Sequence, residues 1–155
     1  MLLPAYVLML RQEMPCLASS RSSSLVALPG ASNHTRNEEA EALLSWKSKL
    51  DNQSRYTLSL WNGSNPCSWH GIGYDPFRRI ANLNLLNSTI NSMFHHLNFS
   101  QLPNLVTIKV ANNLLFRNIT LSIGDLSKLI ILYFSQNILS GNIPPQLRML
   151  QSLQL

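Results

Sequence analysis

Three copies of one apolar pattern, spaced 25 and then 24 residues apart, restrict the folds open to this chain more than any other feature. The copies begin at Ile80, Leu105 and Leu129, and each has apolar residues at its first, fourth, sixth and eleventh positions. A repeat of this length cannot bury its apolar side on its own. Successive copies are therefore expected to stack and to share one core.

The spacing L-x-x-L-x-L-x-x-N, with a period in the twenties, is typical of leucine-rich repeats. In the L-x-L part, both apolar side chains point inward from a short strand, and the strands of successive coils pair in parallel. We expect an α/β fold, a solenoid with a parallel concave sheet and an irregular convex side, which Gly141, Pro144 and Pro145 favour. One contiguous core is expected from Leu83, Leu85, Ile108, Val110, Leu132 and Phe134.

The ninth position of each copy is polar and is expected to lie where the repeat strand ends and the chain turns away. It holds Ser88, Asn113 and Asn137 in turn. An asparagine amide both donates and accepts, so it can bond backbone groups left unpaired where each strand turns away. We expect Asn113 and Asn137 to form a structural ladder that is broken in the first coil, at Ser88.

The residues between the inward leucines are expected to face the concave surface and to contact a protein or peptide partner. Tyr133, Lys109 and Ile131 make a small amphipathic patch among them. Three coils offer little area against the ~800 Å² per side of a standard interface. The candidate contact residues are Asn82, Asn84, Asn87, Thr107, Lys109, Asn112, Ile131, Tyr133 and Gln136.

The segment before the repeats predicts a helix from about Glu38 to Leu50. Leu43, Trp46 and Leu50 form one apolar stripe, and Thr35 or Asn37 could cap the start. Glycines and prolines then interrupt a stretch that carries two further tryptophans, so a turn-rich region is expected there.

These features resemble the extracellular domains of plant leucine-rich-repeat receptor-like kinases. Residues 139–144 read LSGNIP, similar to that family's repeat signature, and residues 39–47 with the later tryptophans look like its N-terminal cap. The resemblance implies a cap at 37–79, about three repeats at 80–155 in a truncated chain, and a ligand-sensing role. The implied partners are a protein or peptide ligand, or other leucine-rich-repeat receptors.

Two departures from the family pattern bear on this interpretation. The family cap usually has a second cysteine where Tyr74 stands, which leaves Cys67 free or paired with Cys16. The chain also stops just inside a fourth coil, without a membrane helix or a kinase. The alternative function is a non-signalling short secreted repeat protein, or a gene fragment, that associates only with longer leucine-rich-repeat proteins.

The N-terminal residues and the sequons bear on the compartment. Residues 1–36 are interpreted as a degraded signal peptide or a disordered leader, because the apolar run has the length of a signal peptide but poor flanks. Six N-x-S/T sequons exceed the roughly two to three expected by chance. They favour an extracellular location, or the outer face of the plasma membrane, and stand at Asn33, Asn52, Asn62, Asn87, Asn98 and Asn118.

Composition and motifs exclude several other functions. The net charge of +5 comes without any cluster of three cations, which disfavours nucleic-acid binding. No apolar run approaches the ~20 residues of a membrane span. The four histidines lack metal-site spacing, and nucleophile-elbow, Walker and kinase signatures are absent from the sequence. We expect no enzyme activity, no metal and no cofactor.

Overall fold

A computed structural model of the chain describes residues 33–63 and 65–154, with side chains from Glu38 onward. The leader predicted for residues 1–36 lies outside the described residues, except for the backbone of residues 33–36 at the start of the first helix. No helix in the described ranges is long and apolar enough to cross a bilayer.

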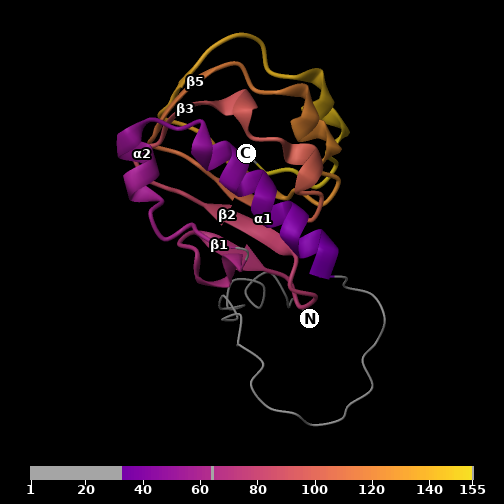
Figure 1. Cartoon of the computed structure of the whole chain (residues 1–155). Helices are drawn as coiled ribbons and strands as arrows, with labels where there is room; N and C mark the ends of the chain where they lie inside the picture. The colour runs from indigo at the N-terminus through magenta and orange to yellow at the C-terminus, as the bar shows by residue number, and fades with distance from the viewer. Residues whose placement is uncertain (1–32, 64, 155) are drawn as a thin grey trace, which may run out of the picture.

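A helical cap occupies one end of the molecule (Figure 1). It consists of α1 (Asn33–Ser48), α2 (Asn52–Thr57), the 3₁₀-helix η2 (Pro66–Ser68) and strand β1 (Ile72–Tyr74). Helix α1 begins earlier than the sequence predicted, so Thr35 and Asn37 lie inside the helix and do not cap it. Helix α2 was not predicted. Asp51 starts it by accepting the Ser54 N–H at 2.7 Å.

The repeats build a four-stranded sheet with the order β1-β2-β4-β6. The three repeat strands pair in parallel, as the spacing predicted, while β1 joins β2 antiparallel and ties the cap to the first coil. The repeat strands are β2 (Ile80–Asn84), β4 (Thr107–Lys109) and β6 (Ile131–Tyr133).

A second parallel sheet, which the sequence did not predict, follows the turn that ends each repeat strand. Its order is β3-β5-β7, and its inward positions include the buried Ser92 and Leu115. The cap contacts its first strand, because the Asn91 N–H donates to the Ser54 hydroxyl of α2 at 2.8 Å. The strands are β3 (Asn91–Met93), β5 (Leu114–Arg117) and β7 (Ile138–Leu139).

The return path of each coil is short 3₁₀-helix, which confirms the irregular convex side. Asn98 and Thr120 cap two of these segments by accepting backbone N–H bonds from Ser100 and Ser122. The segments are η3 (Phe94–His96), η4 (Phe99–Gln101), η5 (Leu121–Asp125) and η6 (Pro145–Met149).

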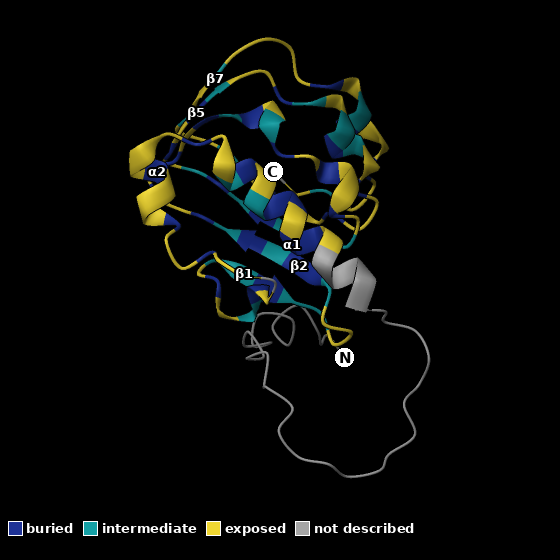
Figure 2. Ribbon diagram, viewed as in Figure 1, coloured by how far each residue is buried: buried dark blue, intermediate teal, exposed yellow. Residues whose placement is uncertain are grey.

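The core lies between the two sheets and the convex segments, where Figure 2 shows the buried residues. The inward set predicted from the repeats is buried with Leu43, Trp46 and Leu50 of the cap, apart from Phe134, which is half-buried against this core. The prediction of one contiguous core is confirmed.

The tryptophans hold the turn-rich part of the cap in place. Trp61 and Trp69 stack with their ring centroids 5.5 Å apart. Each indole N–H also donates to a backbone carbonyl: Trp61 to His70 at 2.9 Å, and Trp69 to Asn62 at 3.0 Å. A region with little regular structure is thereby fixed by buried area and by satisfied polar groups.

Cys67 lies in η2 and is disulfide-bonded. The expectation that it could be a free thiol is therefore wrong. The sequence's other cysteine, Cys16, lies outside the described residues. Tyr74, at the position of the family's second cysteine, is half-buried in β1 and packs against the core.

Candidate functional site

The nine candidate contact residues fall into three rows across the coils, which we call the concave rows. Strand pairing places Asn82 beside Thr107 and Thr107 beside Ile131, and it places Asn84 beside Lys109 and Lys109 beside Tyr133. The third row lies just past the strand ends and contains Asn87, Asn112 and Gln136, all exposed.

The second row ends in an exposed aromatic and a cation. The Lys109 ammonium lies 5.9 Å from the centroid of the Tyr133 ring, within the range of a cation–π contact. The Tyr133 side chain is 45% exposed to solvent. An exposed tyrosine held beside a lysine offers a partner apolar area together with hydrogen bonding.

The third row has an unusual backbone conformation that repeats from coil to coil. Asn87, Asn112 and Gln136 all have a φ of 54°, in the left-handed region. The Asn112 amide donates to the Asn87 side-chain oxygen at 2.6 Å, so the row begins as a chain of amides. Amides of this kind can bond the main chain of an extended peptide.

The ladder residues lie beneath the rows and fix the spacing of the coils. The Asn113 oxygen accepts the Ile90 N–H at 2.8 Å, and its amide donates to the Leu85 carbonyl at 2.7 Å. Asn137 makes equivalent bonds to the Leu115 N–H and the Val110 carbonyl, at 3.0 and 2.9 Å. The Ser88 hydroxyl donates to the Leu86 carbonyl of its own turn, and within the described part of the chain it makes no bond to a neighbouring coil.

A buried carboxylate joins the cap to the coils beside this sheet. Glu39 of α1 accepts the N–H of Ile80, the first residue of β2, at 2.9 Å. Its other oxygen accepts from the Asn104 amide at 3.4 Å, and Asn104 in turn accepts from Lys128 at 2.7 Å. Burial raises the pKa of Glu39, and the bonds from Ile80 and Asn104 only partly oppose that rise.

The sequon asparagines with described side chains are all exposed. Asn87 stands in the third concave row, and Asn98 caps η4. Asn52 and Asn62 belong to the cap, while Asn118 directly follows β5. The side chain of Asn33 lies outside the described residues.

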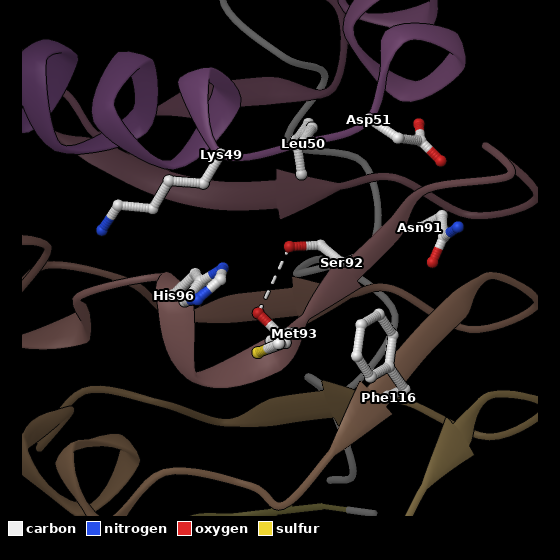
Figure 3. Close-up of a pocket in the computed structure, with 8 residues that line it drawn as sticks. All are labelled: Lys49, Leu50, Asp51, Asn91, Ser92, Met93, His96 and Phe116. Atoms are coloured by element: carbon white, nitrogen blue, oxygen red, sulfur yellow. Dashed lines mark hydrogen bonds between the residues drawn. The ribbon is translucent and has the colours of Figure 1, made fainter.

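Sequence reasoning missed a groove of about 300 Å³ between the cap and the second sheet (Figure 3). Its lining comes from three separate segments, so no single motif could reveal it. The lining residues are Lys49, Leu50, Asp51, Asn91, Ser92, Met93, His96 and Phe116.

Two titratable groups of this groove have shifted pKa values. Hydrogen bonds from the Ser54 N–H and hydroxyl lower the pKa of Asp51. Burial, with the neighbouring His95 and Lys49, lowers the pKa of His96. No group of three His, Cys, Asp or Glu residues in the described part of the chain is placed to hold a metal ion.

Comparisons with known proteins agree with the cap and the coils. The family model for the leucine-rich-repeat N-terminal domain matches residues 36–73. Among curated proteins of Arabidopsis thaliana, the chain is 36% identical over 109 residues to the leucine-rich repeat receptor-like serine/threonine-protein kinase RGI4, covering 69% of this chain and 10% of that protein. It is 41% identical over 97 residues to MDIS1-interacting receptor like kinase 2, and this match covers 59% of this chain and 9% of that protein. The chain thus spans about a tenth of each relative's length.

Solved structures show the same architecture. The Arabidopsis receptor kinase HAESA, in complex with the peptide hormone IDA and the co-receptor SERK1, matches with a TM-score of 0.65 and 28% identity over 76% of this chain and 20% of that one. The ectodomain of the Arabidopsis receptor kinase GASSHO1/SCHENGEN3, in complex with CASPARIAN STRIP INTEGRITY FACTOR 2, matches with a TM-score of 0.67 and 26% identity. This match covers 75% of this chain and 14% of that one.

The stacked coils, the asparagine ladder and the two sheets define a leucine-rich-repeat solenoid. The cap and its matches narrow the class further. The chain is a leucine-rich-repeat protein similar to those of the plant receptor-like kinase type, and its described part resembles the cap and first repeats of their ectodomains.

Proposed function

We propose that this chain is an extracellular, non-catalytic module that binds a protein or peptide through its concave rows. The observation that carries the proposal is the register of β2, β4 and β6, which aligns the side chains of three coils into one surface. That surface changes from amides in the first coil to Ile131 and Tyr133 in the third.

The chemistry of the rows fits an extended peptide. Amides can bond its main chain, and Tyr133 provides an aromatic anchor of the kind that dominates binding energy at interfaces. A standard interface buries ~800 Å² per partner, which favours a short peptide over a folded domain for three coils. The peptide complex of the similar HAESA structure supports this choice.

The proposed location is the outside of the cell or the outer face of the plasma membrane. The similarity to receptor-kinase ectodomains supports it, as do five exposed sequon asparagines. Protein on that side of the membrane passes through the secretory pathway, where sequons are modified.

The test is to pan a phage-displayed library of random dodecapeptides against the secreted chain and to measure the affinity of the selected peptides. Tyr133→Ala should weaken binding at least tenfold. Tyr56→Ala removes a tyrosine that is 76% exposed in α2 and should change nothing. Peptides that bind both variants equally, or a library without enrichment, would overturn the proposal.

A further inference from the structure

The outer side of the second sheet carries a contiguous apolar surface. Side chains alternate along β5, so Leu114 and Phe116 point outward while Leu115 is buried. Pairing places Met93 beside Phe116 and Phe116 beside Ile138. Leu114 and Ile138 remain 45% and 61% exposed. We call Met93, Leu114, Phe116 and Ile138 the lateral face.

The groove beside the cap extends this surface. Met93 and Phe116 line it together with Leu50, which stands two residues past the end of α1, and Figure 3 shows Leu50 on one side of the groove and the other two on the opposite side. The apolar surface of the sheet therefore continues into the groove. Contiguous apolar surface that borders a groove marks binding sites on soluble proteins.

Two cations and one carboxylate lie around the lateral face. Lys49 lines the groove, and Arg117 ends β5 next to Phe116. The acidic lining residue, Asp51, accepts the Ser54 N–H and keeps its negative charge. The Nδ1 atom of His96 is buried and has no hydrogen-bond partner among the described residues. The groove thus offers one cation, Lys49, and an unused polar atom beside apolar side chains, and Arg117 adds a second cation at the end of β5.

The sequon asparagines stand outside the strands of the second sheet. None of the sequon asparagines stands in β3, β5 or β7. Asn118, which follows β5, lies past the strand end and beside Gly141.

We propose that the lateral face binds an extended apolar segment of a partner protein that carries acidic residues on its flanks. The apolar side chains of the segment would pack on Leu114, Phe116 and Ile138, and a carboxylate would lie near Lys49. This surface is separate from the concave rows. The inference adds a second contact site and stands independently of the proposed function.

The experiment is an amide NMR titration of the full ¹⁵N-labelled chain with two synthetic peptides. Acetyl-Asp-Leu-Phe-Leu-Asp-amide is the probe, and acetyl-Lys-Leu-Phe-Leu-Lys-amide has the same apolar centre with the charges reversed. We expect the acidic peptide to shift amides of β3, β5 and β7. Its dissociation constant should be at least fivefold lower than that of the basic peptide. Amides of β4 and β6 should stay unchanged.

Two variants locate the contact. Ile138→Ser should weaken the acidic peptide about fivefold without affecting the fold, because Ile138 is mostly exposed. Leu121→Ser replaces an equally exposed apolar residue of η5, away from the lateral face, and should leave binding unchanged. Lys49→Glu should remove the preference for the acidic peptide.

Four results would overturn the proposal. They are no shifts at millimolar peptide, shifts confined to the concave strands, equal affinity for both peptides, and equal loss of binding in Leu121→Ser. Concentration-dependent association of the chain that Ile138→Ser abolishes would assign the face to a second copy of this chain, and would also overturn it.

Discussion

At the scale of single residues, a few buried polar side chains connect one coil to the next. Asn113 bonds backbone groups of the first coil, and Asn137 does the same for the second. Glu39 bonds the backbone at the start of β2. Each of these side chains satisfies backbone atoms that no strand pairing reaches, so their removal leaves buried polar groups unpaired.

Asn113→Ala tests the ladder. It removes the bonds to the Ile90 N–H and the Leu85 carbonyl, and each buried group left unsatisfied costs about 1–3 kcal/mol. We expect the free energy of unfolding in urea to fall by about 3 kcal/mol. Asn142→Ala, at an exposed position, should change it by less than about 0.5 kcal/mol. Equal effects would contradict the structural role of Asn113.

Glu39→Gln tests the buried carboxylate. Because the folded-state pKa is raised, the unfolded chain loses this proton first, and stability falls as pH rises from the ordinary value near 4.5 through the folded value. Glutamine can still accept the Ile80 N–H but has no charge. The stability of Glu39→Gln relative to wild type should therefore increase as pH rises through this window.

Urea unfolding of both proteins between pH 4 and pH 7 measures this difference. Asp51 and Asp75 have lowered pKa values, so the stability that they contribute is lost mainly below pH 3.8, outside this range. A relative stability that decreases as pH rises would show that the charged form of Glu39 is favoured in the fold.

At the scale of elements, the repeat pattern determined what could be predicted. The L-x-L spacing predicted β2, β4 and β6 and their inward side chains because alternation in a strand has a fixed period. The second sheet was missed because the repeat pattern marks at most one apolar position in each of its strands, such as Leu115 in β5 and Leu139 in β7, without the L-x-L alternation that marks the first sheet. Helix α2 was missed because six residues form no apolar stripe, and only its cap, Asp51, marked it.

Gly71→Ala tests how closely the cap approaches the first coil. Gly71 has a φ of 79°, and a methyl group there would overlap the carbonyl oxygen of Asn84. We expect a loss of about 3 kcal/mol from the left-handed backbone and the clash together. Gly63→Ala, with a φ of 68° and no described atom within 4 Å, should cost about 1 kcal/mol. Thermal unfolding of the two variants gives the comparison.

At the scale of the whole molecule, the solenoid separates its surfaces. Alternation and period together predicted the residues of the concave rows, because residues 24 or 25 apart become neighbours when coils stack. The groove needed the cap to be docked on the second sheet, and neither feature is encoded locally. The concave rows, which the repeat itself builds, could therefore be predicted from the sequence. The groove between the cap and the repeats could not.

Glycan mapping tests the proposed compartment. Secretion from eukaryotic cells should give protein modified at the exposed sequons, with Asn98 and Asn118 occupied because both lie away from the concave strands. Mass spectrometry after glycosidase treatment reads the occupied sites. Glycan-free protein retained in the cytosol would contradict an extracellular role and would leave the fold unaffected.

The most direct test of the binding account is photo-crosslinking to a peptide selected from the dodecapeptide library. A benzophenone amino acid replaces Thr107 or Tyr133 in the concave rows, and Leu121 in η5 serves as the control position. We predict crosslinked product from positions 107 and 133 and none from 121. Crosslinking from 121 alone, with the concave positions unreactive, would contradict the claim that the concave rows bind the partner.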